Sequence, residues 1–436
     1  MSGLKKSLTK TKSKRKKVKA FHQKVKVFRA TDPKMAVLMW GVSHSISQLS
    51  HVPPPVMLLK DDFKAYSKIK IDNHFYNKEN MPGHFKVKEY MPLVFRNLRE
   101  RFTIDERLYA SSFLIQPKSI EDSGNSGAKF LRTVDKRFLI KTMEREEVEM
   151  MHQIMPSYYQ YVVESHSDTL LPQYLGMYRT TIESKEYYYM VIRSIFSDKK
   201  RIHKKYDLKG SRIDRECKGS EKEKDFPTFK DNDFTKDNAK LYIGENKKTC
   251  LLEKLKKDVN FLSSLNMMDY SLLIGIHDTE HVDSDPEDEQ DGEDGFETGD
   301  DSADGLDEPS SPDDTDATPR FTRTESTSSN SGAAYDSDFF LIHCNDESRH
   351  EVYYAGIIDV LTYYGATKKA AHAAKTVKHG VLNMRRRSVS EPGTKRWSLI
   401  FDTDKLDFAK AGAEISTVKP QVYANRFLEF IESAFE

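Results

Sequence analysis

The chain has 436 residues, of which 37% are hydrophobic and 31% are charged, so it is polar for a globular protein. Its formal net charge of +1 hides a segregation of charge. Residues 1–29 hold twelve Lys/Arg and no acid, whereas residues 280–318 hold eighteen Asp/Glu and no Lys/Arg. No stretch reaches the roughly eighteen apolar residues of a membrane span, and no apolar segment follows the basic N-terminus, which argues against secretion. Three scattered cysteines favour a reducing compartment and argue against structural zinc.

Hydrophobic periodicity and turn residues predict the elements along the chain. We interpret residues 1–29 as a flexible basic arm, and the acidic tract over about 280–337 as disordered. In order, we expect a helix over 31–50, a half-buried strand over 68–72, a helix over 93–110, a hairpin over 129–142, a helix over 144–161, a strand over 187–196, a loop over 207–240, a helix over 252–265, strands over 268–276, 339–343 and 352–361, and a terminal helix over 423–435. The ordered parts therefore belong to the α+β class.

A turn of small residues precedes the predicted hairpin and contains Ser123, Gly124, Ser126 and Gly127. Such a turn lets backbone N–H groups approach phosphates. Lys141, in the second strand of the hairpin, could reach the same phosphates as a point charge. An ordinary hairpin with an edge lysine is the alternative, and these residues alone favour it, because Gly/Ser turns are common.

Two aspartates stand in apolar surroundings. Asp269 opens the run MDYSLLIG, where a carboxylate is expensive to bury without a partner or a role. Asp359 lies inside the run IIDVL, which suits a carboxylate that holds a metal ion against phosphate oxygens. A capped strand start and a paired structural aspartate are the alternatives. With Lys141, the two aspartates match the minimal parts for phosphoryl transfer from Mg-ATP, although the sequence has no HRD, DFG or GxxxxGK[ST] motif.

Three further segments are rich in charge. KKYDLKGS at 204–211 and KDNDF at 230–234 read by default as solvated loops. The basic run at 368–379 could lie on anionic lipid as a short amphipathic segment. A nuclear-import or phosphate-binding patch is the alternative for that run.

At these residues the sequence closely resembles the phosphatidylinositol phosphate kinases, over about residues 20–278 and 339–436. The strings that carry the resemblance are DLKGS at 207–211, KDNDF at 230–234, LLEKLKKDV at 251–259, MDYSLLIGIHD at 268–278 and IIDVLT at 357–362. The type II branch, the phosphatidylinositol-5-phosphate 4-kinases, is indicated by MWGVSHSI at 39–46, DDFKAYSKIKIDNH at 61–74, NKENMP at 77–82, EYMPLVFRNLRERF at 89–102 and KKAAHAAKTVKHG at 368–380. In the last of these strings the type I branch carries Glu where this chain has Ala371.

The resemblance implies an atypical kinase-like fold, with an antiparallel-sheet N-terminal lobe, a reduced C-terminal lobe and a homodimeric state. Residues 30–436 would form the kinase domain, interrupted by the acidic insertion 280–337 and by an activation loop at 365–415. The implied activity is transfer of the γ-phosphate of ATP to the 4-hydroxyl of phosphatidylinositol 5-phosphate, which gives phosphatidylinositol 4,5-bisphosphate. The implied cofactors are ATP and Mg²⁺.

The resemblance also assigns roles to single residues. Lys141 would be the ATP-phosphate lysine, Asp269 the catalytic-loop aspartate and Asp359 the metal-binding aspartate. Further implied nucleotide contacts are Ser123, Gly124, Ser126, Gly127, the hinge residues Arg193, Ser194 and Ile195, and Lys205. Implied substrate or membrane contacts are Lys209, Lys230, Lys368, Lys369, Ala371 and Lys375.

The chain departs from the family pattern at three places. The hinge reads Ile192-Arg193-Ser194 where the family usually has Thr-Arg-Asn, so GTP stands beside ATP as a candidate nucleotide. The activation loop carries an extra segment, 381–410, whose RRRSVS string would suit a basic-directed protein kinase. The pattern after Lys141 also changes, and Glu146 is the residue that we expect to pair with this lysine.

The expected partners are a phosphoinositide and an anionic membrane surface. We expect the protein to be cytoplasmic and peripheral on inner membranes, where it would meet the phosphoinositide and the anionic surface. The nucleus is a further expected location. A homodimer is expected, with heterodimers with other phosphatidylinositol phosphate kinases as an alternative. A weakly active or inactive phosphoinositide-binding scaffold is the alternative function. Nucleic acid is not an expected partner, since no aromatic-rich sheet motif or recognition helix accompanies the basic arm.

Overall fold

The structure, a computed structural model, describes residues 30–72, 81–120, 128–196, 198–224, 226–280, 339–365 and 418–436. The expected basic arm lies outside these residues. The acidic insertion and the activation loop lie outside them as well, except for their first residues, Glu280 and Gly365. Eight candidate site residues also fall outside: Ser123, Gly124, Ser126, Gly127, Lys368, Lys369, Ala371 and Lys375.

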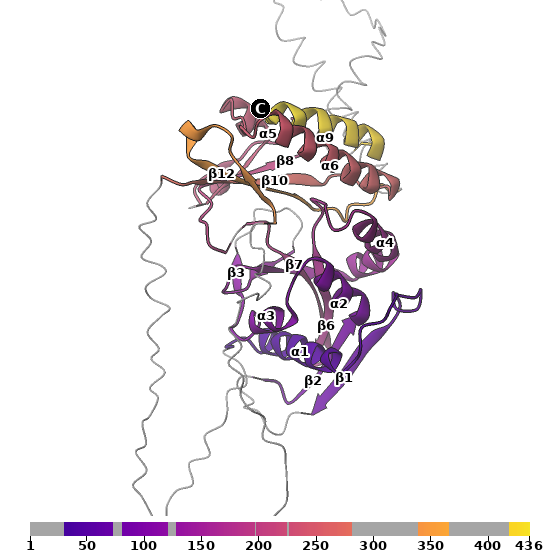
Figure 1. The fold of residues 1–436 in the computed structure, drawn as a ribbon. Coiled ribbons are helices and arrows are strands. Elements are labelled where there is room, and N and C mark those ends of the chain that lie inside the picture. The colour runs from indigo at the N-terminus through magenta and orange to yellow at the C-terminus, as the bar shows by residue number, and fades with distance from the viewer. Residues whose placement is uncertain are drawn as a thin grey trace, which may run out of the picture.

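The first of two lobes is built on a seven-stranded sheet in which every neighbouring pair of described strands is antiparallel (Figure 1). Across the sheet the order is β1 (Tyr66–Asp72), β2 (His84–Tyr90), β6 (Tyr174–Ile182), β7 (Lys185–Arg193), β5 (Phe138–Met143), β4 (Phe130–Arg132) and β3 (Lys118–Ile120). Its helices are α1 (Pro33–Ser50), α2 (Pro92–Arg101), α3 (Glu106–Ser111) and α4 (Arg145–Glu164). The expected antiparallel sheet is confirmed.

The second lobe holds a five-stranded sheet with β10 at its centre. Its order is β11 (Leu341–His343), β12 (Glu351–Ile358), β10 (Ser271–Asp278), β8 (Lys204–Leu208) and β9 (Thr228–Lys230). Only β8 and β9 run parallel among these described strands. The helices α5 (Asp231–Lys236), α6 (Glu245–Ser264) and α9 (Pro420–Ala434) lie together on one side of this sheet in Figure 1, and two short 3₁₀ turns are η1 (Gly219–Glu221) and η2 (Glu347–Arg349). The architecture is α+β, as expected.

The first helix begins where the sequence predicts a cap. The Asp32 carboxylate accepts a hydrogen bond from the Lys34 backbone N–H at 2.9 Å, and a proline occupies the first turn. Leu38 and Val42 are fully buried in the main apolar cluster of the protein. The helix expected at this position is therefore confirmed.

Two expectations about local structure are wrong. The helix expected over 93–110 is two helices, because Thr103 adopts a left-handed φ of 55° that a continuing helix cannot contain. The loop expected over 207–240 contains β9 and α5. Its charged residues suggested solvation, whereas Asp231 and Asp233 are buried and bind backbone N–H groups.

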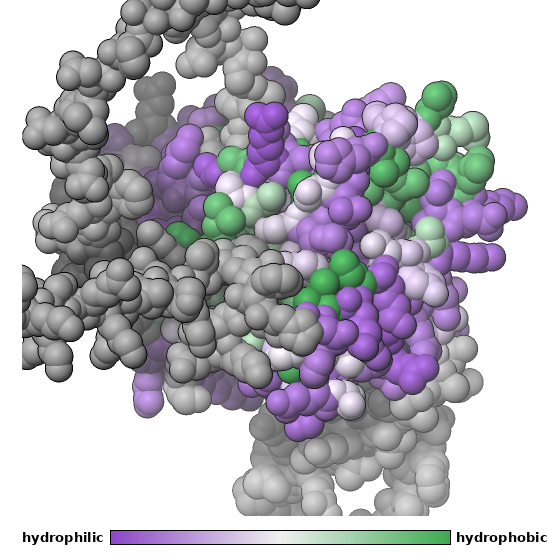
Figure 2. Space-filling model, turned by 90° about the horizontal axis from the view of Figure 1, so that it is seen from below, coloured by the Kyte–Doolittle hydropathy of each residue, from purple (hydrophilic) through white to green (hydrophobic). Residues whose placement is uncertain are grey.

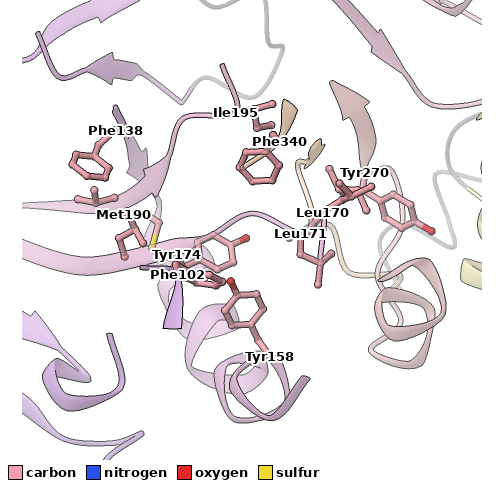
Figure 3. Close-up of a cluster of buried hydrophobic side chains, with 14 of the residues drawn as sticks. Phe102, Phe138, Tyr158, Leu170, Leu171, Tyr174, Met190, Ile195, Tyr270 and Phe340 are labelled. Carbon is pink, nitrogen blue, oxygen red and sulfur yellow. The ribbon is translucent and has the colours of Figure 1, made fainter. Parts of the chain in front are cut away.

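One apolar cluster joins the two lobes. Figure 3 shows Phe138 and Met190 of the first sheet together with Phe340 and Tyr270 of the second lobe, and Leu170 of the connecting segment lies between them. All five are buried. Because such interiors are packed as tightly as organic crystals, this shared core holds the lobes in a defined relation.

The outer surface of the first lobe is polar. Figure 2 shows this lower face, on which the described residues are mostly hydrophilic and the hydrophobic ones gather in small groups. Within the described ranges, no helix combines the length and the apolar character that crossing a bilayer requires.

Asp258 of α6 is buried at the junction between the lobes. Its carboxylate accepts hydrogen bonds from the Tyr161 hydroxyl at 2.6 Å, the Thr169 hydroxyl at 2.7 Å and the Leu170 N–H at 2.7 Å. Burial raises the pKa of Asp258 from 3.8 to about 6, in spite of these three bonds. Since Tyr161 belongs to α4 and the other donors to the connecting segment, Asp258 ties both to the second lobe.

Replacing Asp258 by Asn should lower the free energy of unfolding by about 1–3 kcal/mol, because the amide nitrogen cannot accept a donated bond. In the native chain the raised pKa makes the stabilising contribution of Asp258 fully present below pH 3.8. That contribution is lost as the pH rises through about 6. Urea unfolding of both chains should therefore give a larger stability difference at pH 5 than at pH 8. Equal differences at the two pH values would contradict the raised pKa.

Candidate active site

The two predicted aspartates lie at the same end of two adjacent strands. In the antiparallel pair β10–β12, Ser271 stands opposite Ile358. Asp269 comes two residues before β10, and Asp359 comes directly after β12. Both backbones are left-handed, with φ values of 64° and 60°. Asp359 was expected inside the strand, and this is wrong, because its left-handed backbone ends the extended ladder.

Lys209 joins Asp269 to the DLKGS loop. Its Nζ donates to Asp269 Oδ1 at 3.0 Å, and the two side chains are 14% and 24% exposed. Lys209 directly follows β8, whose last residue, Leu208, pairs with Leu272 of β10. A charge-assisted bond of this kind fixes the orientation of the carboxylate. The remaining exposure leaves the Asp269 carboxylate within reach of a substrate.

Asp231 supports the DLKGS loop. One carboxylate oxygen, Oδ1, accepts from the backbone N–H groups of Lys209 at 2.9 Å, Gly210 at 2.7 Å and Ser211 at 3.3 Å. The other, Oδ2, accepts from Arg215 Nε at 2.7 Å. The Asp231 side chain is only 1% exposed, so these donors replace the water that burial removes.

Arg215 completes this cluster. Its Nη2 donates to the Asp207 backbone oxygen at 2.5 Å and to the Asp207 carboxylate at 2.9 Å. Burial acts to raise the pKa of Asp207, but the positive charges of Arg215 and Lys209 outweigh it and hold the pKa below its usual value. The DLKGS and KDNDF strings therefore form one buried unit, and the solvated-loop alternative is wrong.

Lys141 lies in β5, which has β4 on one side and β7 on the other, so the edge-lysine alternative is wrong. Its Nζ donates to Glu147 Oε1 at 2.8 Å, with side chains 13% and 27% exposed. The second oxygen of Glu147 accepts from the Glu144 N–H at 3.0 Å and so caps α4. The expected partner, Glu146, is exposed and is therefore corrected to Glu147, because the third helical position points back toward the cap.

Tyr174 connects the two groups of site residues. Burial is the main cause that raises the pKa of its hydroxyl, and the negative charges of Asp359 and Glu147 raise it further. Coulomb interaction falls with distance, so both carboxylates lie near this one phenol. Asp359 and Glu147, the partner of Lys141, therefore lie within electrostatic range of the same buried hydroxyl.

Arg193 ends β7 at the expected hinge. The side chain is buried, and its Nη1 donates to Gln173 Oε1 at 3.1 Å and to the Phe102 backbone oxygen at 3.3 Å. The guanidinium carbon also lies 5.2 Å from the centroid of the Phe339 ring, so the side chain contacts both lobes.

The next two hinge residues are also engaged by the protein. The Ser194 hydroxyl donates to the Phe196 backbone oxygen at 3.0 Å. Ile195 is buried, and a Cβ built on Gly356 would lie 2.8 Å from its Cδ1, so its side chain packs directly on the β12 backbone. The backbone N–H groups of Arg193 and Ser194 are bound as well, by the Gln173 oxygen at 3.1 Å and the Arg137 oxygen at 2.8 Å.

Lys205 and Lys230 lie on neighbouring strands of the second sheet. Lys205 stands opposite Gly275 of β10, and its ammonium lies 4.6 Å from the centroid of the Phe226 ring. Lys230 ends β9, and its backbone N–H donates to Asp233 Oδ2 at 3.0 Å. Lys209, in contrast, binds a candidate aspartate, Asp269.

The donor set suits Mg²⁺ rather than a metal held entirely by protein. Among the described residues, no three or more His, Cys, Asp or Glu side chains are grouped to hold a metal ion. Mg²⁺ is usually bound by one or two carboxylates, with waters and substrate phosphates as its other ligands. Asp359, whose exposed carboxylate is an oxygen donor of the kind that Mg²⁺ prefers, fits that arrangement.

Comparisons with known proteins decide the family. Residues 114–434 match the sequence model of the family described as phosphatidylinositol-4-phosphate 5-kinase. Over 427 residues the chain is 49% identical to human phosphatidylinositol 5-phosphate 4-kinase type-2 alpha, a match that covers 97% of this chain and 96% of that protein. The chain belongs to the phosphatidylinositol phosphate kinase family.

Two other relatives agree with this result. Identity is 48% over 429 residues to the chicken type-2 alpha protein, covering 98% of this chain and 97% of that one. It is 46% over 413 residues to the mouse type-2 beta protein, covering 94% and 92%. The resemblance of this phosphatidylinositol phosphate kinase to the type II branch is therefore confirmed.

Sequence reasoning missed Glu147, Asp231 and Arg215. A local signal existed for Glu147, since Glu144 and Glu147 have the spacing of a capping box. For the other two the fold itself was needed, because parallel pairing of β8 with β9 brings together two strings that lie about twenty residues apart.

In this phosphatidylinositol phosphate kinase, Asp231→Asn should loosen the DLKGS loop, because an amide cannot accept all four bonds that the carboxylate accepts. We expect amide exchange over residues 207–214 to become at least about tenfold faster, as the loss of about 1.4 kcal/mol of local stability requires. Hydrogen–deuterium exchange with mass spectrometry measures this. Asp233→Asn is the matched control, because its carboxylate binds the N–H groups of Cys217 and Lys230 instead. Equal exchange over 207–214 in the native and Asp231→Asn chains would contradict the assigned role.

Proposed function

We propose that this chain is a lipid kinase that transfers the γ-phosphate of ATP to the 4-hydroxyl of phosphatidylinositol 5-phosphate. The product is phosphatidylinositol 4,5-bisphosphate. The observation that carries the proposal is the identity of 46–49%, over nearly the whole length, to proteins named phosphatidylinositol 5-phosphate 4-kinase type-2. The Lys141–Glu147 ion pair, the Lys209–Asp269 ion pair and the position of Asp269 and Asp359 at the same end of two paired strands support it.

In this proposal each charged group has a defined task. Lys141, held by Glu147, binds the ATP phosphates as a fixed positive charge. Asp269 accepts the proton of the inositol hydroxyl as the hydroxyl oxygen bonds to the γ-phosphorus and the bond to the ADP oxygen breaks. Lys209 orients the Asp269 carboxylate for this transfer.

Asp359 would hold Mg²⁺ on the ATP phosphates. The ion, when bound, supplies charge neutralisation on the phosphate oxygens. The other residues of the chain position the reactants and shield them from water, which is how most of the acceleration of phosphoryl transfer arises.

The finer expectations belong to the same proposal. We place the enzyme in the cytoplasm, peripheral on inner membranes, as a homodimer with a kinase domain over 30–436 and a reduced C-terminal lobe. The arm 1–29, with twelve basic residues, would supply attraction to anionic lipid of about 1 kcal/mol for each residue near the surface. Lys230 and the lysines of the basic run 368–375 would add to substrate and membrane contact.

The first test is turnover of the full chain on vesicles that contain phosphatidylinositol 3-, 4- or 5-phosphate, with radiolabelled ATP or GTP. We expect labelling of the 5-phosphate, and loss of at least about 100-fold in rate for Asp359→Asn, because a neutral amide binds Mg²⁺ weakly. Full activity of that variant would contradict the assignment. Vesicle binding without any turnover by the native chain would favour the scaffold alternative instead.

The second test compares two neighbouring glutamates. Glu147→Gln removes the negative partner of Lys141 and should raise the KM for ATP about tenfold, which corresponds to about 1.4 kcal/mol of lost positioning. Glu146→Gln is the matched control, since Glu146 is exposed and precedes Glu147 on the same helix. Equal KM values in both variants would contradict the pairing as a functional one.

A further inference from the structure

The C-terminal helix α9 contacts the DLKGS loop backbone to backbone. Gly210 adopts a left-handed φ of 64°, and a Cβ built there would lie 2.9 Å from the Arg426 backbone oxygen and 3.1 Å from Phe427 Cα. Glycine is therefore required at this position both for its backbone conformation and for the close approach. The loop that carries Lys209 consequently rests on α9.

The same helix also contacts the backbone beside Asp269. The Tyr423 hydroxyl donates a hydrogen bond to the Tyr270 backbone oxygen. The Tyr270 ring packs edge-on against Tyr423, with centroids 4.8 Å apart, and against Phe427, with centroids 5.2 Å apart. All three side chains are buried, so Tyr270, the residue after Asp269, is fixed against α9 by both its backbone and its ring.

The carboxylates of the site also interact electrostatically with residues of α9. After burial, the negative charge of Asp269 is the largest cause that raises the pKa of the Tyr423 hydroxyl. Burial lowers the pKa of Arg426, while the charges of Tyr423, Asp231 and Asp269 act to raise it. Tyr423 and Arg426 therefore lie within electrostatic range of the site carboxylates.

We propose that Tyr423 is a positioning residue, whose bond to the Tyr270 carbonyl holds the left-handed backbone of Asp269 and so keeps its carboxylate on Lys209. A left-handed backbone is sterically disfavoured for a residue that carries a Cβ, so at Asp269 it needs support from its surroundings. The bond to Tyr270 and the ring packing on α9 are those surroundings. This inference rests on the proposed kinase function, because the group that is positioned is the proton acceptor of that reaction.

The test is Tyr423→Phe, which removes the hydroxyl and keeps the ring. With phosphatidylinositol 5-phosphate vesicles we expect kcat to fall about tenfold while the KM for ATP stays within about twofold, because the ATP-phosphate lysine lies in the other lobe. Tyr353→Phe is the matched control, since it removes a hydroxyl that donates to Glu351 at 2.6 Å, at the end of β12 away from Asp359. An unchanged kcat in Tyr423→Phe, or an equal fall in the control, would overturn the inference.

Two additions keep the outcome decisive. If Tyr423→Phe does not fold, Phe427→Leu replaces it, because this change loosens the Tyr270 ring and keeps the hydroxyl of Tyr423. A fall in kcat at unchanged KM supports the inference, and an unchanged kcat overturns it.

Amide exchange over residues 266–271 is the readout that needs no activity, and faster exchange in Tyr423→Phe is expected. A native chain without turnover would refute the proposed function, while the exchange data would still decide whether Tyr423 holds this loop.

Discussion

The antiparallel pairing of β10 with β12 is the interaction on which the site depends. Eight residue pairs, from Ser271 opposite Ile358 to Asp278 opposite Glu351, set the register of the two central strands. Residues 352–357 of β12 are buried on both faces of the sheet, and a shift of one residue would move each of their side chains to the opposite face, where it would have to be repacked. The register is continued past the strands by the bond from the Met268 N–H to the Thr362 oxygen at 3.0 Å. Asp269 and Asp359 are thus brought to one end of the sheet by packing that has no part in their chemistry.

Three carboxylates, two of them buried and one half-buried, then connect elements that the sheets do not join. Asp231 joins the DLKGS loop to the start of α5, Asp258 joins α6 to the first lobe, and Glu147 joins α4 to β5. Each of them accepts bonds on both carboxylate oxygens, whereas a hydroxyl or an amide offers a single acceptor oxygen. A buried charge left without such partners would cost several kcal/mol, so these bonds are specific to one arrangement of the elements.

Secondary structure could be predicted from the sequence wherever residues close together in the chain determine it. The cap at Asp32, the hairpin that places Lys141 and the stripe of α6 are each settled by residues within a few positions of one another. The pairing of Lys209 with Asp269 could not be predicted, because sixty positions separate the two residues and the contact depends on β8 lying beside β10. The break at Thr103 and the left-handed Asp359 were missed for a related reason, since tertiary packing overrides local propensity there. The roles in catalysis came from the resemblance to a family, and they remain predictions for the residues that carry them.

The shared β10–β12 pairing has a consequence for how the chain tolerates changes in length. Residues 279–350 connect the two paired strands, and residues 365–417 connect the end of the site to α9. The entropy of closing such a connection grows only with the logarithm of its length, by about 0.6 kcal/mol for each doubling. Residues added between β10 and β12, or between Gly365 and α9, therefore change the folding free energy little. Both connections can therefore lengthen while β10 and β12 keep the register that places Asp269 and Asp359.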